Sequence, residues 1–138
     1  MPAEFDIGPV VEKYSAVPIE RLRILSSCDG FQLSNLRRGI VFVFATWSGP
    51  AIIGLQRFTK AIEPFAANSI DLIVLNTDCL TETLESELFR IPNLRPAGGG
   101  ETIWVRDGHV VAGVFACTAP EALIEQHTKE LLDDNRSS

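Results

Sequence analysis

The stretch GIVFVFATWSGPA, residues 39–51, decides the fold together with a predicted helix that follows it and reaches about Ala67. Residues 40–44 are all apolar and either β-branched or aromatic, which predicts a strand buried on both faces. Gly49-Pro50 then marks a turn, and Pro50 suits the first turn of a helix because its missing N–H would have no partner there.

The residues after this turn predict an amphipathic helix. Its apolar residues recur every three or four positions, and they are Ile52, Leu55, Phe58, Ile62 and Phe65. A buried strand, a tight turn and a helix place the turn at the carboxyl end of the strand. Open α/β sheets keep their functional sites at this end.

Length and composition indicate one globular domain. The chain has 138 residues, of which 46% are hydrophobic, enough to bury a core of its own. The net charge of −6 and the scattered basic residues argue against a nucleic-acid partner. The sequence shows no signal peptide and no run of 18 apolar residues, so we expect no membrane association and a cytoplasmic location. We expect Cys28, Cys79 and Cys117 to be reduced thiols.

The rest of the chain alternates between predicted strands and helices. Residues 9–17 predict a short helix, 21–26 an edge strand, 70–76 a second buried strand parallel to the first, and 81–90 a helix. The three glycines at 98–100 precede a strand, not a helix, so we interpret them as a flexible loop and not as a phosphate loop. Asp107-Gly108 between apolar runs predicts a hairpin.

The last helix is predicted to open at Thr118 as the N-cap, with Pro120 in its first turn. Its inner stripe is predicted from the apolar spacing, with His127 as a packed core histidine: Leu123, Ile124, His127 and Leu131.

Residues 45–51, Ala-Thr-Trp-Ser-Gly-Pro-Ala, resemble the thioredoxin active-site segment Trp-Cys-Gly-Pro-Cys with both cysteines replaced. With the order of elements and the Asp-Gly hairpin, the resemblance runs from about Arg21 to Asp133. It implies an α/β fold, a thioredoxin-like three-layer sandwich whose mixed central sheet of four or five strands carries helices on both faces. Residues 21–138 would form this domain, and residues 1–20 an extension packed on it.

The resemblance also implies that the family's dithiol chemistry is lost. Ser48 stands where the nucleophilic cysteine would be, and Ala51 where the resolving cysteine would be. Phe42 occupies the position of the family's buried carboxylate, and Gly100 that of its cis-proline. We therefore expect no thiol–disulfide oxidoreductase activity and no cofactor. We also expect no metal, because no histidine lies near the carboxylates of residues 82–87.

Two functions remain open on the sequence. The first is a protein-interaction or regulatory module, toxin neutralisation being one such role, which binds an unidentified protein through the former active-site groove. We expect this groove to be lined by Trp47, Ser48, Gly49, Pro50, Gly99, Gly100, Glu101 and Cys117. An exposed tryptophan would suit such an interface, and the alternative for Trp47 is packing over the N-terminal extension.

The second function is an enzyme that binds glutathione or another thiol ligand through Ser48 at the helix N-terminus. Glu101 could stand near Ser48 as an acid or base. Neither His109 nor His127 is expected near enough to activate the serine. The competing interpretation of Ser48 is an N-cap that satisfies the first N–H groups of the helix. Cys117 is expected to be a small buried thiol.

Overall fold

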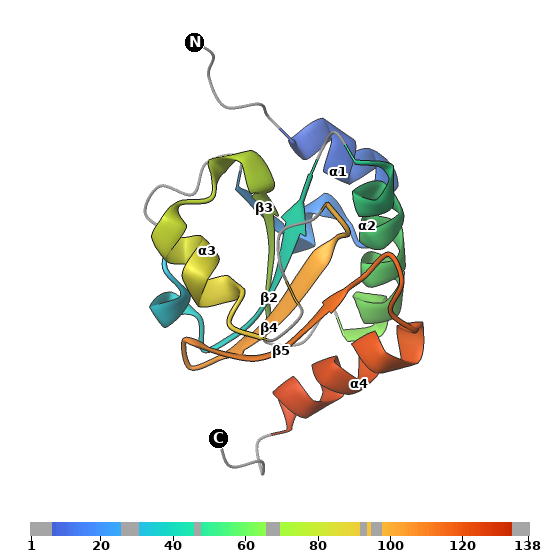
Figure 1. Ribbon diagram of the computed structural model, residues 1–138. Coiled ribbons are helices and arrows are strands. Elements are labelled where there is room, and N and C mark those ends of the chain that lie inside the picture. The colour runs from blue at the N-terminus through green and yellow to red at the C-terminus, as the bar shows by residue number, and fades with distance from the viewer. Residues whose placement is uncertain are drawn as a thin grey trace.

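A computed structural model describes residues 7–25, 31–45, 48–65, 70–91, 94 and 98–133 of the chain (Figure 1). Its five-stranded sheet has the order β1-β3-β2-β4-β5, with β1, β2 and β3 parallel and β4 and β5 antiparallel to their neighbours. The strands are β1 (Arg23–Leu25), β2 (Arg38–Phe44), β3 (Asp71–Asn76), β4 (Glu101–Arg106) and β5 (His109–Phe115). The predicted mixed sheet, with the strand of residues 40–44 at its centre, is confirmed.

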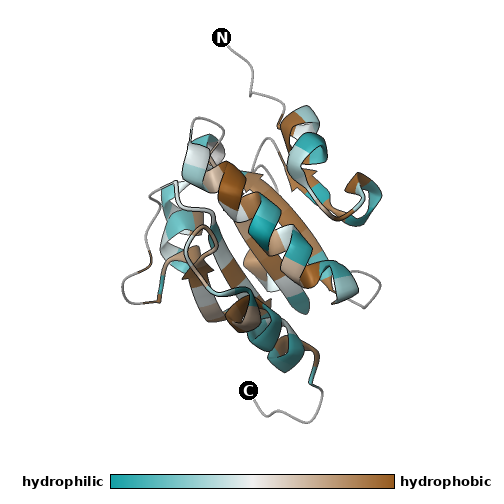
Figure 2. Ribbon diagram, turned by 90° about the vertical axis from the view of Figure 1, so that its right-hand side faces the viewer, coloured by the Kyte–Doolittle hydropathy of each residue, from teal (hydrophilic) through white to brown (hydrophobic). Residues whose placement is uncertain are grey.

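Helices cover both faces of this sheet, which confirms the three-layer α/β sandwich. One face carries α1 (Gly8–Tyr14), α2 (Gly49–Ile62) and α4 (Glu121–Leu132), and the other carries α3 (Glu82–Leu88) (Figure 1). Seen from the α2 side, the strands behind this helix are mostly hydrophobic (Figure 2). Within the described residues no helix combines the length and the hydropathy needed to cross a bilayer.

The central strand β2 supplies side chains to both cores because successive residues of a strand point to opposite faces. Phe42 and Phe44 are fully buried in the core under α2, where the Phe42 ring stacks on that of Phe58 at 5.4 Å between centroids. Val41 and Val43 are buried in the core under α3. A strand apolar on every residue is therefore needed at this place in the sheet.

The segment that follows α1 is fixed to α2 by a buried hydroxyl. The backbone N–H of Ala16 donates to Thr59 Oγ1 at 3.0 Å, and the same hydroxyl donates to the Leu55 carbonyl oxygen at 2.7 Å. Val11 and Val17 are buried in the same core as α2. This contact holds the first helix against the rest of the fold.

The predicted Asp-Gly hairpin joins β4 to β5. Asp107 and Gly108 both have positive φ, 49° and 80°, which is the conformation of a two-residue type I′ turn. Their backbone N–H groups donate to the carbonyl oxygens of Arg37 and Leu36, at 2.8 and 2.9 Å. The hairpin turn is thus bonded to the chain just before β2, at the end of the sheet opposite to Ser48.

Several predicted helix boundaries differ from the observed ones: the sequence predicts α1 over 9–17 and α3 over 81–90, and the end of α2 and the start of α4 differ as well. Helix α2 ends at Ile62 and continues as a 3-10 helix over Glu63–Phe65, because Pro64 lacks the N–H that a further helical turn requires. Helix α4 begins at Glu121 with Pro120 as its N-cap, and no side chain caps it. The Thr118 hydroxyl instead donates to the Phe115 carbonyl oxygen at 3.4 Å, within the loop that follows β5.

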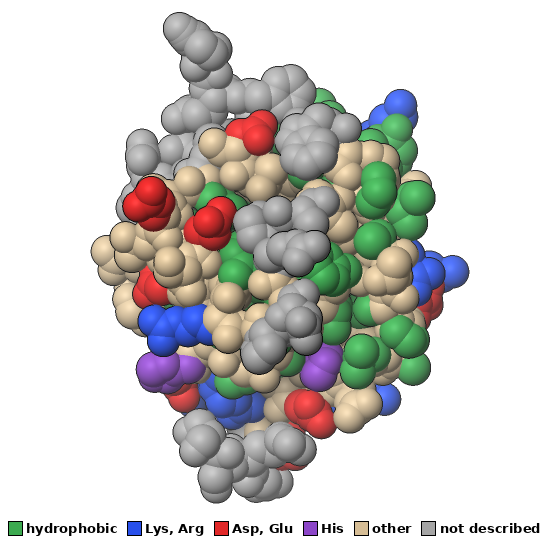
Figure 3. Space-filling view, in the orientation of Figure 1, with side chains coloured by type: hydrophobic (Ala, Val, Ile, Leu, Met, Phe, Trp, Pro, Cys, Tyr) green, Lys and Arg blue, Asp and Glu red, His purple; other side chains and the backbone are tan. Residues whose placement is uncertain are grey.

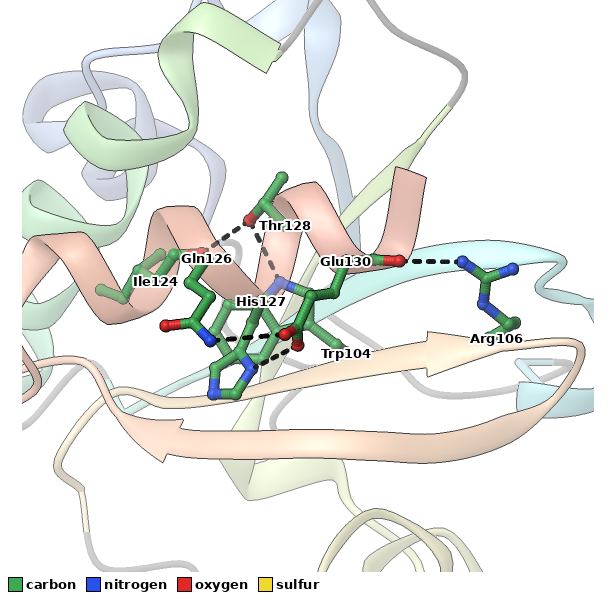
Figure 4. A network of polar contacts seen from close by, with 7 residues as sticks. All are labelled: Trp104, Arg106, Ile124, Gln126, His127, Thr128 and Glu130. Atoms are coloured by element: carbon green, nitrogen blue, oxygen red, sulfur yellow. Dashed lines mark hydrogen bonds and ion pairs between the residues drawn. The ribbon is translucent and has the colours of Figure 1, made fainter. Parts of the chain in front are cut away.

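The buried side of α4 also differs from the predicted stripe. Its buried residues are Ile124, Thr128 and Leu131, whereas the His127 side chain is 22% exposed. In Figure 4, His127 lies beside Trp104, with 4.9 Å between the ring centroids. The Trp104 Nε1–H donates to Thr128 Oγ1 at 3.1 Å. A buried indole N–H needs an acceptor, and this need turns Thr128 toward the sheet.

Candidate functional site

Ser48 is the N-cap of α2. Its backbone is extended, and its Oγ accepts the backbone N–H of Ala51 at 3.3 Å. The same hydroxyl donates to the Gly98 carbonyl oxygen at 2.5 Å, 50 residues further along the chain. The side chain is 7% exposed. The hydroxyl therefore donates its proton to the glycine loop and accepts one hydrogen bond from the helix.

The triple-glycine segment is part of the core, which corrects the expectation of a flexible loop. Gly98, Gly99 and Gly100 are all buried. The backbone N–H groups of Ala116 and Cys117 donate to the carbonyl oxygens of Gly100 and Gly99, at 3.0 and 3.2 Å. The loop is thereby bonded on one side to Ser48 and on the other to the chain that leaves β5.

Gly100 occupies a position at which any other residue would be strained. Its φ is +72°, a conformation that L side chains rarely adopt. A Cβ atom at this position would stand 3.2 Å from the Cα of Gly54 in α2 and 3.2 Å from the ring of Phe42. The glycine loop consequently packs against the backbone of α2 and against the Phe42 side chain of β2. The position that resembles the family's cis-proline is occupied by a close packing contact.

Glu101 is also hydrogen-bonded to the glycine loop. Its carboxylate Oε2 accepts the backbone N–H of Gly99 at 2.7 Å, and its side chain is only 1% exposed. A Cβ added to Gly99 would meet Cys117 Sγ at 3.4 Å and Glu101 Oε2 at 3.5 Å, so the thiol and the carboxylate flank the same glycine. Ser48, the glycine loop with Glu101, and the chain that leaves β5 thus lie together at one end of the sheet.

The exposed part of this site is the start of α2. Gly49 and Pro50 are exposed, Ile53 is 51% exposed, and Cys117 is half-buried, not buried as expected for a small core thiol. Hydrophobic side chains gather on the α2 side of the molecule in Figure 3. Trp47, expected to be the aromatic residue of the groove, lies outside the described residues.

Arg57 fixes the loop between β5 and α4 beside this surface. Its guanidinium donates to the Ala116 carbonyl oxygen, at 3.0 Å from Nε, and also to that of Ala119. Arg57 is half-buried and lies on the turn of α2 after Ile53. The sequence predicts no role for Arg57, because its two acceptors lie 59 and 62 residues further along the chain and no local pattern indicates them.

Neither histidine is part of the site. His109 directly follows the hairpin turn at the opposite end of the sheet. His127 belongs to α4, where it contacts Trp104 and lies 3.7 Å from the carboxylate of Glu130. The Ser48 hydroxyl contacts the Ala51 N–H and the Gly98 carbonyl, so a serine–histidine pair is not formed.

Comparison with known proteins supports the fold. No family model matches the chain, and no curated protein matches it in sequence. Among solved structures it is similar to mitochondrial thioredoxin 3 of Saccharomyces cerevisiae, with TM-score 0.57, 13% identity, and coverage of 80% of this chain and 96% of that one. Oxidised thioredoxin of Plasmodium falciparum gives TM-score 0.57 at 18% identity, covering 79% and 96%.

A thioredoxin mutant of Halobacterium salinarum NRC-1 gives TM-score 0.55 at 15% identity, covering 86% of this chain and 96% of that chain. These similar structures are redox proteins, and identities of 13–18% show a common fold and nothing of a common activity. The chain has a thioredoxin-like fold.

Proposed function

We propose that this chain is a thioredoxin-fold protein-interaction module that carries out no thiol–disulfide exchange and binds its partner through the exposed start of α2. The observation that carries the proposal is the hydrogen bond from Ser48 Oγ to the Gly98 carbonyl oxygen. At the position of the family's nucleophile, the side chain holds two parts of the fold together. The Ser48 hydroxyl is therefore engaged in the fold and is not offered to a substrate.

The redox half of the proposal follows from the chemistry of the residues. Exchange through a mixed disulfide needs a thiolate to attack and, for turnover, a second thiol to resolve the intermediate. Ser48 and Ala51 supply neither. Cys117 is a free, half-buried thiol beside Gly99, and no second described cysteine side chain accompanies it. A lone thiol does not reproduce the dithiol cycle.

The alternative function, a thiol-ligand enzyme that uses Ser48, is less well supported by the geometry. A serine that stabilises a ligand thiolate must direct its O–H toward the ligand. Here that proton is donated to Gly98 at 2.5 Å, and the side chain is 7% exposed. Binding would have to break a buried hydrogen bond and leave the Gly98 carbonyl without its partner, at a cost of about 1–3 kcal/mol.

The proposed binding of a protein partner is supported by Pro50 and Ile53. Both are exposed, and both belong to the first two turns of α2, next to the half-buried Cys117 loop. Exposed apolar side chains that stand together form the kind of surface that protein partners bury. A regulatory role, with toxin neutralisation as one form, would use this surface. Trp47, which precedes Ser48 in the chain, would extend it.

The first test is the insulin-reduction assay with dithiothreitol. The protein should give the background rate, and a Ser48→Cys, Ala51→Cys double variant should raise it if the helix start still fits a dithiol. Turnover by the unaltered protein that disappears in Cys117→Ser would overturn the redox half. Conjugation of glutathione to chlorodinitrobenzene, lost in Ser48→Ala, would establish the alternative enzyme.

The second test compares two exposed apolar residues of similar accessibility. Ile53 on α2 is 51% exposed and Val111 on β5 is 53% exposed, so Ile53→Asp and Val111→Asp place the same charge on different surfaces. A partner captured from the native host should lose binding to Ile53→Asp and keep binding to Val111→Asp. The opposite pattern would move the interface to β5. Trp47→Asp tests whether the tryptophan belongs to the same surface.

A further inference from the structure

A cavity of about 260 Å³ lies at the other end of the sheet, beside the β4–β5 turn. Three segments form its walls: the 3-10 helix Leu33–Asn35, the end of α3, and the start of β5. Gly108 packs so closely on the first of these that an added Cβ would stand 3.0 Å from the Cα of Ser34. The turn and the 3-10 helix therefore hold one another in place around the cavity.

Two opposite charges line this cavity without pairing. Glu87 belongs to the last turn of α3, and Arg90 lies just beyond the end of this helix; both line the cavity. Within the part of the chain that the structure describes, neither makes a hydrogen bond or an ion pair. Each thus presents its full charge to the cavity and the solvent.

The remaining lining divides into donors and apolar surface. His109 is exposed and offers one ring N–H even when neutral, whereas the Ser34 hydroxyl already donates to Gln32 Oε1 at 3.4 Å. Leu33 is buried and Val110 half-buried, so they supply an apolar wall. In Figure 3, Lys or Arg side chains and a histidine lie side by side at the lower left, over the β4–β5 turn.

We propose that this cavity binds a small zwitterion of the α-amino-acid type, with its carboxylate on Arg90, its ammonium group on Glu87 and an apolar side chain against Leu33 and Val110. A guanidinium matches a carboxylate through two parallel hydrogen bonds, and His109 lines the same cavity as a further donor. A pure anion would face repulsion from Glu87, and a pure cation from Arg90. A ligand that carries both charges satisfies both residues.

This site is separate from the proposed interaction surface. Its turn is bonded to Leu36 and Arg37, before β2, whereas Ser48 follows the other end of that strand. Loss of one function therefore leaves the other in place, and the two proposals can fail independently.

The experiment is an NMR titration of the ¹⁵N-labelled protein with L-valine, with acetate as the anion-only probe and methylammonium as the cation-only probe. L-valine should shift the backbone amides of Ser34, Gly108 and Val110 in a saturable way, and at least tenfold more tightly than either half-ligand. Arg90→Gln should abolish binding of both L-valine and acetate. Glu87→Gln should remove the preference for L-valine over acetate.

Matched controls come from charges outside the cavity. Glu85→Gln changes an exposed residue of the same helix, and Arg23→Gln an exposed residue on β1; both should bind L-valine as the unaltered protein does. All four residues are at least partly exposed, so the variants should keep the dispersed spectrum of a folded domain. The proposal is overturned if L-valine gives no saturable shift at concentrations up to about 20 mM, which would saturate a site with a Kd of about 1 mM. It is also overturned if acetate binds equally tightly in both the unaltered protein and Glu87→Gln.

Discussion

Ser48 Oγ and the Gly98 carbonyl oxygen lie 2.5 Å apart across 50 residues of sequence. Because the same oxygen accepts the Ala51 N–H, one hydroxyl both starts α2 and holds the glycine loop against it. In a dithiol enzyme of this fold the equivalent position must remain available to a substrate. Here it stabilises the protein itself, and the consequence can be measured.

Replacing Ser48 by alanine should lower the free energy of unfolding by about 1–3 kcal/mol, since it removes the cap and leaves the Gly98 carbonyl without its donor. Urea unfolding followed by circular dichroism would show a lower midpoint at an unchanged slope. Ser86→Ala is the control, because Ser86 is exposed on α3, and alanine there should be neutral or slightly stabilising. Equal midpoints for Ser48→Ala and the unaltered protein would contradict the structural role.

Gly100→Ala should be strongly destabilising, by about 1–3 kcal/mol from the backbone conformation alone. The contacts of the new methyl group with Gly54 and Phe42 at 3.2 Å would add to this cost. Gly49→Ala is the matched control, since a Cβ there meets nothing within 4 Å at the exposed start of α2. Thermal melts of the two variants should therefore differ, with Gly49→Ala staying within about 0.5 kcal/mol of the parent. Similar melting temperatures would refute the close packing of the loop.

Thr128→Val should destabilise the domain by about 1–3 kcal/mol although it keeps the side-chain shape, because the buried Trp104 Nε1–H loses its acceptor. Thr128→Ser retains the hydroxyl and should lose less. Figure 4 shows this contact between β4 and α4. Denaturant unfolding of both variants gives the comparison. A serine variant as unstable as the valine variant would show that the methyl packing, not the hydrogen bond, is what matters.

Arg106→Gln should loosen the end of α4. The Arg106 guanidinium donates to the carbonyl oxygens of Glu130 at 3.0 Å and Leu131 at 2.5 Å, which are among the last carbonyls of the helix. Without it, amide hydrogen exchange in the last turn of α4 should speed up by roughly tenfold, the equivalent of about 1.4 kcal/mol. Lys129→Gln, an exposed change in the same turn, should have a smaller effect. Unchanged exchange in Arg106→Gln would contradict this contact.

The sequence by itself determined the elements whose signals are local. The apolar run Ile40 to Phe44 predicted the central strand, because its residues are β-branched or aromatic and a strand covered on both faces is apolar throughout. Asp107-Gly108 predicted the hairpin, since these two residues adopt the positive φ angles of its turn at little cost. Ser48 before Gly49-Pro50 predicted the start and the cap of α2.

Only the tertiary structure decided how the distant segments use their polar groups. The spacing of apolar residues in α4 allowed His127 to be an inner residue, but the buried indole N–H of Trp104 selected Thr128 instead. The three glycines predicted a flexible loop because glycine has the greatest backbone freedom. In the structure, however, the carbonyl oxygens of Gly98 to Gly100 accept hydrogen bonds from Ser48, Ala116 and Cys117. Such hydrogen bonds join residues far apart in the chain, so no local pattern encodes them, and they form only when the sheet brings both partners together.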